Sequence, residues 1–422
     1  MKISPPGPKL LSLTSSSLRR LHSPPFTGKL LCTRWYSAQA KLEKTPLQSV
    51  KQEIRETLQH FLLQNHQQHH ILYGPNDYTN HLAHVLLTDS ALGATTQRLH
   101  DIFKSFDFLD SLPEPTKVKI TEDNWLLYRG LKRHYRDYLD FYDEKIRNVG
   151  VLEVTSKYAP PLFSHFLGGA LHPIIHLGFG LEFNQPLLVS EALAYASTIP
   201  SPFTSVYGLL QGASAPNQKD VSLLELIQEV HEDTEFDVPI LGNPVEGLGS
   251  LVEARGSRLI EFANRWKLQD NNCSIKIAEL FEAAVLLYAG TGSGRRIDFF
   301  IAHGLSSARG VNNVLPYLSK TSRIALLRSH WLAMLSLYVT SGRPKLVASS
   351  VTEYQSNISS WDECIDKGIN SPDEHVPKMI RTLYMAHCDF GKNRTEYFKA
   401  AQMTIDIVKK TDDWEFQGVG NS

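Results

Sequence analysis

The chain has 422 residues, of which 42% are hydrophobic and 10% aromatic, so it can bury a sizeable core. Its 43 basic and 44 acidic residues give a formal net charge of −1, and no basic stripe marks a nucleic-acid surface. No apolar run reaches the length of a membrane span. The four cysteines include no CxxC pair, which argues against a disulfide framework and a zinc ribbon. These features leave a globular chain with neither a nucleic-acid partner nor a membrane span, and they do not set its oligomeric state.

The first 42 residues differ from the rest of the chain. They carry seven Lys or Arg residues and many serines, and the first acid is Glu43. An acid-free, Arg- and Ser-bearing N-terminus is typical of a mitochondrial presequence, and Arg34-Trp-Tyr-Ser37 resembles a processing site. A disordered tail is the alternative, because five prolines would interrupt an amphipathic helix. We therefore predict a leader at 1–42, one domain at 43–422 and a mitochondrial location, with the cytoplasm as the alternative.

Beyond the leader, apolar residues recur mostly at helical spacing. The pattern runs through 47–62 and 324–337, and the composition of 278–288 favours a helix. Long β-branched alternations are rare. Glycines and prolines mark loops near 159–161, 199–202, 238–248 and 341–344. The sequence predicts an all-α fold, a single multi-helix domain.

A glycine-rich stretch has two interpretations. Gly290, Gly292 and Gly294 follow an apolar run, which superficially suggests a dinucleotide-binding loop. That loop needs a β-strand before the glycines, whereas 278–288 is predicted to be helical. We predict a connection between two helices here.

Two histidines stand one helical turn apart in the apolar segment 166–183. On an α-helix, residues i and i+4 share a face, so the rings of His172 and His176 can converge on one point, as in helical zinc and iron sites. Gly178 and Gly180 would allow neighbouring helices to pack closely around them. The alternative is a pair of core histidines that are hydrogen-bonded to backbone or to a carboxylate.

Similar histidines recur elsewhere in the chain. His81 and His84 lie three residues apart in a helical pattern, His303 follows an apolar run, and His375 opens a predicted helix that also carries Lys378. Imidazole-rich sites suit iron, zinc, copper or nickel, and the shortage of inward carboxylates argues against magnesium or calcium. Spacing does not choose among the first four metals.

At these residues the sequence resembles the questin oxidase-like proteins of fungal polyketide pathways. The resemblance covers most of the chain after the N-terminal extension. It is carried by Asn80-His-Leu-Ala-His84 with Ala91-Leu-Gly-Ala94, by His172-Pro-Ile-Ile-His-Leu-Gly-Phe-Gly-Leu-Glu182, by Phe299-Phe-Ile-Ala-His303 and by His375-Val-Pro-Lys378.

The resemblance implies an all-α enzyme that opens an anthraquinone or related aromatic polyketide ring. It implies non-haem Fe(II) held by four histidines and a carboxylated lysine, and it links the family to NADPH as a reductant. Carried onto this chain, the metal ligands would be His172, His176, His303, one of His81 and His84, and carboxylated Lys378.

The lysine has a physical argument of its own. Pro377 suits the first turn of a helix and Asp373 or Glu374 suits its cap, which would place Lys378 near the positive end of the helix dipole. Dipole and burial both lower the pKa of an amine, and the neutral amine can capture carbon dioxide to give an anionic carbamate. The alternative is a solvated lysine on the first turn.

We therefore expect an oxidoreductase that uses dioxygen to cleave a ring carbon–carbon bond of an aromatic polyketide at a non-haem iron. One alternative is a metal-free, NADPH-dependent Baeyer–Villiger-type monooxygenase in which the histidines act as acids and bases. The other is a helical binding protein without catalysis.

Overall fold

The computed structural model describes residues 46–391 and 394–421, and over these residues the chain is helical with one two-stranded sheet. The α-helices are α3 (Gln52–Gln68), α4 (Leu82–Leu92), α5 (Thr96–Ser105), α6 (Tyr135–Tyr158), α7 (His172–Glu182), α8 (Pro186–Thr198), α9 (Leu223–Glu232), α10 (Leu248–Arg265), α11 (Cys273–Gly290), α12 (Phe299–Val314), α13 (Lys320–Thr340), α14 (Ser349–Thr352), α15 (Trp361–Ile369), α16 (His375–Phe390) and α17 (Glu396–Ile407). The strands are β1 (Leu72–Tyr73) and β2 (Tyr78–Thr79), which pair antiparallel. The all-α prediction is confirmed, and the predicted leader at 1–42 lies outside the described residues.

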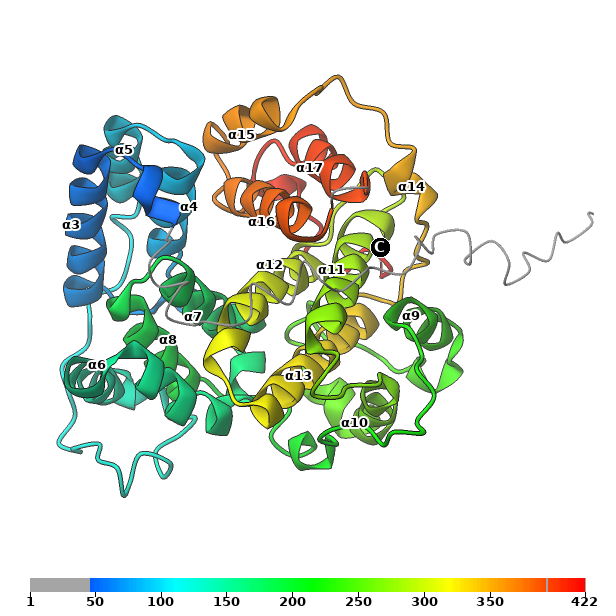
Figure 1. Ribbon diagram of the computed structural model, residues 1–422, viewed down its shortest axis with the longest axis horizontal. Helices are drawn as coiled ribbons and strands as arrows, with labels where there is room; N and C mark the ends of the chain where they lie inside the picture. The colour runs from blue at the N-terminus through cyan, green and yellow to red at the C-terminus, as the bar shows by residue number, and fades with distance from the viewer. Residues whose placement is uncertain (1–45, 392–393, 422) are drawn as a thin grey trace, which may run out of the picture. The chain divides into compact units, whose positions relative to one another are not determined.

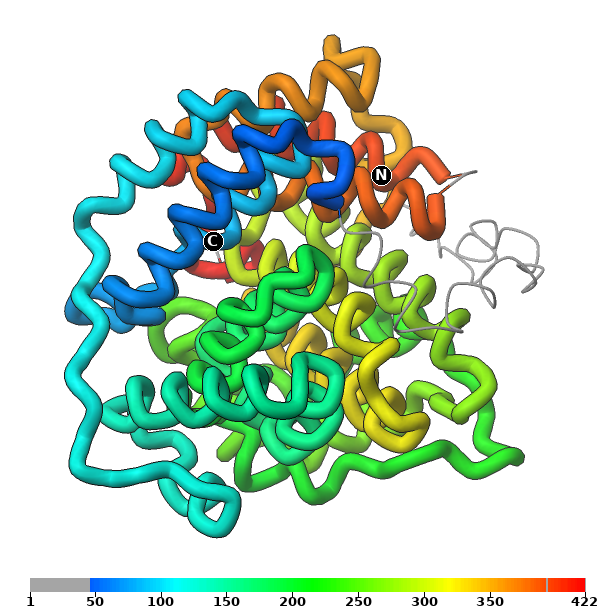
Figure 2. Tube along the Cα trace, turned by 60° about the vertical axis from the view of Figure 1, so that its left-hand side comes forward, coloured from blue at the N-terminus to red at the C-terminus, as the bar shows by residue number. Residues whose placement is uncertain are grey.

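Helices from distant parts of the sequence lie side by side (Figure 1). Helix α7 packs against α12 and α8, and α6 covers α8. Helix α16 packs against α17, α12 and α4, so the first helices lie beside the C-terminal ones, as the blue and orange segments of Figure 2 show. Among the described residues, no helix combines the length and apolar character that a bilayer crossing needs.

Two glycines allow the close crossing of α7 and α12. A Cβ atom on Gly310 would lie 2.5 Å from the carbonyl oxygen of Ile174, and one on Gly178 would lie 2.4 Å from the Cα of Gly310. Any larger residue would therefore push the two helices apart. The predicted close packing at Gly178 is confirmed, and it brings the helices that carry His172 and His303 together.

The glycine-rich stretch joins two helices, as predicted. Helix α11 ends at Gly290, and Gly292 and Gly294 lie in the turn that leads to α12. The predicted loops near 199–202 and 341–344 likewise follow the ends of α8 and α13.

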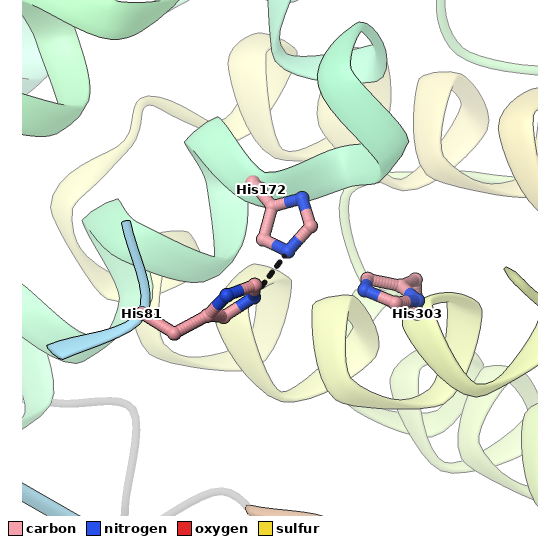
Figure 3. A group of neighbouring side chains, drawn as sticks. All are labelled: His81, His172 and His303. Atoms are coloured by element: carbon pink, nitrogen blue, oxygen red, sulfur yellow. Dashed lines mark hydrogen bonds between the residues drawn. The ribbon is translucent and has the colours of Figure 1, made fainter. Parts of the chain in front are cut away.

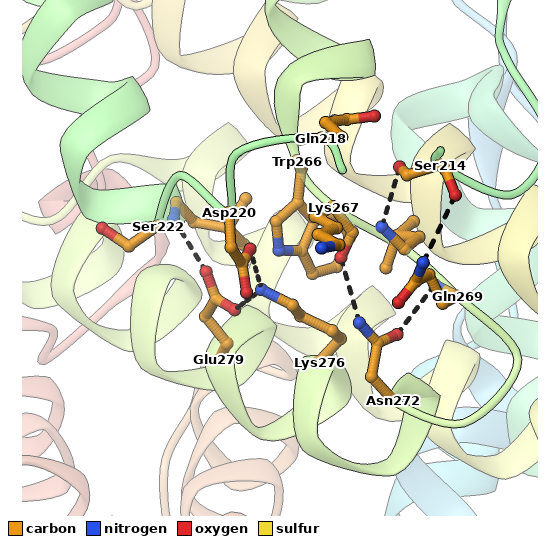
Figure 4. A network of polar contacts seen from close by, with 12 residues as sticks. Ser214, Gln218, Asp220, Ser222, Trp266, Lys267, Gln269, Asn272, Lys276 and Glu279 are labelled. Atoms are coloured by element: carbon orange, nitrogen blue, oxygen red, sulfur yellow. Dashed lines mark hydrogen bonds and ion pairs between the residues drawn. The ribbon is translucent and has the colours of Figure 1, made fainter. Parts of the chain in front are cut away.

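A polar network anchors the loop before α9 to helix α11 (Figure 4). The buried Lys276 Nζ lies 2.7 Å from both Asp220 Oδ1 and Glu279 Oε2. It also lies 5.9 Å from the ring centroid of Trp266. Because two carboxylates neutralise this lysine, its role is structural.

Candidate metal centre

Four helices bring four imidazole rings together in the core. His81 directly precedes α4, His172 and His375 are the first residues of α7 and α16, and His303 lies in α12. The ring centroids of His81 and His172 are 4.7 Å apart, as are those of His172 and His303, and those of His81 and His375 are 4.9 Å apart. We call these four residues the histidine cluster. Figure 3 shows three of them, and one nitrogen from each of these three lies within 4.8 Å of the other two.

The backbone before α7 sets the position of His172. Ala170 and Leu171 have φ angles of +50° and +65°, a left-handed conformation that costs an L-residue about 1 kcal/mol or more. They turn the chain so that α7 begins at His172, with Pro173 in its first turn. Within the apolar segment 166–183, the α-helix therefore begins only at His172, and the residues before it include short 3₁₀ turns.

Backbone carbonyls fix the ring protons of two cluster histidines. His172 Nδ1 donates to the carbonyl oxygen of Gly169 at 2.7 Å, and His303 Nδ1 donates to that of Phe299 at 2.7 Å. A carbonyl can only accept, so Nε2 of each neutral ring carries a lone pair. Burial, followed by neighbouring cationic groups, keeps the pKa of both histidines well below its usual range, which favours the neutral rings.

The close contact between His81 and His172 is not explained by two neutral rings that both carry their proton on Nδ1. Nδ1 of His81 lies 3.0 Å from Glu374 Oε1 without the alignment of a hydrogen bond, and the negative charge of an ionised Glu374 favours a proton on Nδ1. Nε2 of His81 lies 2.8 Å from Nε2 of His172. Two lone pairs at this distance repel each other unless a cation or a proton lies between them. Neighbouring nitrogen ligands about 2.1 Å from one metal ion would be separated by about 3 Å at right angles, so the donor set fits a metal ion.

Several of the buried polar atoms that lack a hydrogen-bond partner among the described residues belong to the histidine cluster or to Lys378. Among the described residues, His303 Nε2, both ring nitrogens of His375, and Lys378 Nζ have no hydrogen-bond partner, although all three side chains are buried. The closest acid to His375 is Asp373, with 3.4 Å between Nδ1 and Oδ1. Buried polar atoms are nearly always paired, so such a group is expected where an ion or ligand binds.

Lys378 is placed as predicted in the first turn of α16 and is 3% exposed, so the solvated alternative is wrong. Burial lowers its pKa to about 8, although Glu374 and Asp373 oppose the shift. The neutral amine, the form that reacts with carbon dioxide, is therefore more populated near neutral pH than it is for an ordinary lysine.

His84 and His176 form a second pair beside the cluster. Nε2 of His84 and Nδ1 of His176 are 2.9 Å apart, and Nε2 of His176 lies 2.7 Å from Glu191 Oε2. His172 and His176 thus belong to the same helix but meet different partners. The structure groups His172 with His81 and His303, and the predicted ligand roles of His84 and His176 remain predictions.

Sequence reasoning missed Glu191 and His66, considered Glu374 only as a helix cap, and did not include His375 among the metal ligands. Glu191 had a visible signal, because it is the one acid in the apolar helix Pro186–Thr198. His66 had none, since it lies near the end of a polar helix far along the sequence from its partners. His375 was conspicuous only through its spacing from Lys378.

Glu182, at the end of α7, belongs to a separate ionic network. It accepts hydrogen bonds from the buried side chains of Arg309, Arg381 and Asn313. Burial alone would raise the pKa of Glu182, but the two arginines outweigh it and hold the pKa well below its usual range. The network ties α7 to α12 and α16, the three helices that carry His172, His303 and His375.

A surface hollow of about 440 Å³ lies elsewhere in the fold. Its lining residues come from 211–221 and from α10, and they include Gln218 and Arg265. None of the cluster histidines belongs to these elements, so the hollow is not part of the candidate metal centre.

Comparison with known proteins identifies the family to which this chain belongs. Residues 78–383 match the questin oxidase-like family. The chain belongs to the questin oxidase-like family. The matched range contains the whole histidine cluster and Lys378, and family membership assigns the chain to the oxidoreductases.

The questin oxidase-like relatives are similar over most of their length. A Baeyer–Villiger oxidase of Pestalotiopsis microspora is 29% identical over 84% of this chain and 85% of its own. A Baeyer–Villiger oxidase of Emericella nidulans is 28% identical over 83% and 86%, and a questin oxidase of Aspergillus terreus is 25% identical over 84% and 87%.

Proposed function

We propose that this chain is a non-haem iron oxygenase that uses dioxygen to cleave a ring carbon–carbon bond of an anthraquinone or related aromatic polyketide. The names of the relatives support the substrate class and the oxidative chemistry. The observation that supports a metal ion is the 2.8 Å separation of the Nε2 atoms of His81 and His172. In each of these two rings, Nδ1 lies beside an oxygen atom, that of Glu374 Oε1 for His81 and of the Gly169 carbonyl for His172. A cation between the two Nε2 atoms resolves the repulsion.

The cluster residues would have distinct tasks. Nε2 atoms of His81, His172 and His303 would hold the ion, and His375 offers a further nitrogen. Lys378, once carboxylated, would supply the anionic oxygen that a neutral imidazole set lacks. Ferrous iron in this site would supply the one-electron chemistry that dioxygen requires.

The surroundings of the cluster would exclude water and hold a planar substrate. The Phe299 ring centroid lies 4.7 Å from that of His303 and 4.8 Å from that of His375. The ring centroid of Trp414 lies 6.3 Å from that of His375 and 5.9 Å from that of Phe299. Aromatic walls of this kind suit a fused aromatic ring system, which would stack against them.

The metal content of native protein tests the proposal directly. Protein purified anaerobically without a histidine tag should contain stoichiometric iron, and it should consume dioxygen when an anthraquinone is added. Metal-free protein with NADPH-dependent turnover would instead support the Baeyer–Villiger-type monooxygenase. Protein that binds an aromatic polyketide without consuming dioxygen would support the non-catalytic binding protein.

We also propose a mitochondrial location, on the basis of the acid-free residues 1–42 alone. A fluorescent protein fused to residues 1–42 should enter mitochondria. A cytoplasmic fusion protein would reject this location.

A further inference from the structure

The C-terminal segment after α17 returns to the histidine cluster. We call residues 411–421 the C-terminal strap. Glu415 forms a parallel β-bridge with the chain directly before α12. The amide of Phe299 donates to the carbonyl oxygen of Glu415 at 3.0 Å, and the amide of Glu415 donates to that of Ile297 at 2.9 Å. The strap therefore lies along the start of the helix that carries His303.

The extended backbone at the bridge places two aromatic side chains on one side of the strap. Successive side chains of an extended segment point to opposite sides. Glu415 Oε2 lies 3.0 Å from Nη1 of the exposed Arg296. The neighbours of Glu415, Trp414 and Phe416, both meet Phe299, with ring centroids 5.9 and 4.6 Å from that of Phe299. The strap thus presents aromatic rings towards the cluster and a charged side chain away from it.

The end of the strap is docked at a defined position. The amide of Val419 donates to Asp298 Oδ2 at 3.0 Å, and the amide of Gly420 donates to the carbonyl oxygen of Ser341 at 2.8 Å. A Cβ atom on Gly420 would lie 2.7 Å from the carbonyl oxygen of Gly342, so the contact leaves no room for a larger residue. The strap is therefore a specific part of the fold.

Trp414 holds an unpaired hydrogen-bond donor beside the cluster. Its side chain is buried, and its ring centroid lies 6.3 Å from that of His375. The indole Nε1 can only donate, and it has no hydrogen-bond partner among the described residues. Because a buried indole N–H usually finds a partner, this one is expected to meet a bound molecule.

The position of the indole, in addition to its unpaired N–H, distinguishes Trp414. Nε1 of Trp266 and of Trp331 is also buried without a partner in the part of the chain that the structure describes. The ring of Trp266 lies 5.9 Å from Lys276 Nζ, and Trp331 lies in the middle of α13. Among the described residues, neither of these rings contacts a cluster histidine, whereas Trp414 lies against His375.

We infer that the C-terminal strap forms one wall of the substrate site and that the indole N–H of Trp414 donates a hydrogen bond to an oxygen of the bound ring system. The inference rests on the proposed function, from which it takes a fused aromatic substrate with quinone or phenol oxygens. Such an oxygen accepts the unpaired N–H and fixes the orientation of the rings against Phe299. The family match ends at residue 383, before the strap begins, so family membership assigns the strap no role.

The test compares two ring systems that differ in their oxygens. Equilibrium dialysis under nitrogen, which prevents turnover, measures the affinity of the full-length protein for anthraquinone and for anthracene, the same fused rings without oxygen. Trp414→Phe keeps an aromatic ring but removes the N–H. We expect its affinity for anthraquinone to fall roughly 3–10-fold and its affinity for anthracene to fall clearly less. Trp331→Phe removes an unpaired N–H in α13 and is the matched control, which should leave both affinities unchanged.

Hydrogen–deuterium exchange of the native protein gives a second, independent readout. Anthraquinone should slow exchange in peptides from residues 411–421, because the bound rings would cover the strap. This measurement needs no variant, so it decides the matter even if Trp414→Phe fails to fold.

Two results would overturn the inference: equal losses of affinity for the two compounds in Trp414→Phe, or unchanged exchange of the strap in native protein saturated with anthraquinone. Failure of the proposed function looks different. A native protein that binds anthraquinone with the predicted role of Trp414, yet holds no iron and consumes no dioxygen, would refute the oxygenase and support the inference.

Discussion

Lys378 is a buried amine without a hydrogen-bond partner among the described residues, whereas Lys276 is a buried amine with two carboxylate partners. The first lies 3% exposed near four histidines, whereas the second is held by Asp220 and Glu279. Burying an unpaired ammonium costs several kcal/mol, so a lysine in the first situation tends to lose its proton or its charge. The environment thus separates a reactive lysine from a structural one.

Carboxylation of Lys378 is the first prediction. Intact-mass analysis should show the added mass of one carbon dioxide in native protein, and reconstitution with iron should depend on bicarbonate. Lys378→Ala should lose the metal, and Lys378→Glu should recover part of it because its carboxylate is an oxygen donor. Lys276→Ala is the control, and it should lower stability while keeping the metal. An unmodified Lys378 in fully active, iron-loaded protein would contradict the prediction.

The second prediction ranks the two histidines of α7. His172→Ala should lose the metal, because its Nε2 faces His81 in the cluster. His176→Ala should retain it with affinity reduced by about 10–100-fold, since both of its nitrogens already have protein partners. Iron content and Co²⁺ affinity of the two variants measure the difference, with circular dichroism to check that helicity is kept. Equal and total loss in both would show that His176 is itself a ligand.

At the scale of helices, the crossing of α7 and α12 holds the centre together. The two helices carry His172 and His303, whose ring centroids are 4.7 Å apart. Their separation is set where Gly178 meets Gly310, and neither glycine has room for a Cβ. Packing at the crossing and geometry at the centre are therefore linked.

The third prediction follows from that crossing. Gly310→Ala should destabilise the fold by about 1–3 kcal/mol, because the new methyl group forces backbone apart, and it should weaken metal binding as well. Gly249→Ala in α10 is the control. Its Cβ meets nothing within 4 Å, and the residue is exposed, so it should stabilise the helix by about 0.5–1 kcal/mol. Urea unfolding and Co²⁺ titration compare the two, and a Gly310→Ala protein as stable as Gly249→Ala would contradict the account of the crossing.

At the scale of the whole molecule, buried neutral histidines make stability depend on pH. His330 lies outside the cluster, 2.7 Å from Ser307 Oγ, and burial lowers its pKa to about 3. The unfolded chain, with a histidine pKa near 6.5, binds the proton first. The stability from neutral His330 is therefore fully present above pH 6.5 and is lost as the pH falls toward 3.

The fourth prediction is that metal-free protein loses stability as the pH falls, because His330 is neutral when folded. Lowering the pH from 7 to 5 should cost metal-free protein roughly 2 kcal/mol from His330 alone. Burial also lowers the pKa of His81, His172 and His303, and these three act in the same direction. His330→Gln keeps a hydrogen-bonding group beside Ser307 but cannot titrate, so its urea-unfolding free energy should fall less between the two pH values. An identical pH dependence in both proteins would reject this role of His330.

Local sequence was sufficient for the helices and for the placement of some site residues. Helical spacing predicted α3 and α13, and residue composition predicted α11. The run His375-Val-Pro-Lys378 placed its lysine in a first turn. These properties depend on residues within a few positions of each other. The same local chemistry identified His81, His172 and His303 as candidates, and the structure brings them together.

Tertiary structure decided the partners of those residues. Positions i and i+4 place His172 and His176 on one face of α7, but what each ring meets depends on α4, α8 and α12, which reach α7 from distant parts of the chain. The burial of Lys378 likewise depends on how α16 packs against α4 and α12. Sequence by itself therefore determined a helical chain rich in imidazole donors. Only packing between distant segments, such as those of His81 and His172, which are 91 residues apart, determined which nitrogens face one another, because long-range contacts leave no periodic signal in the sequence.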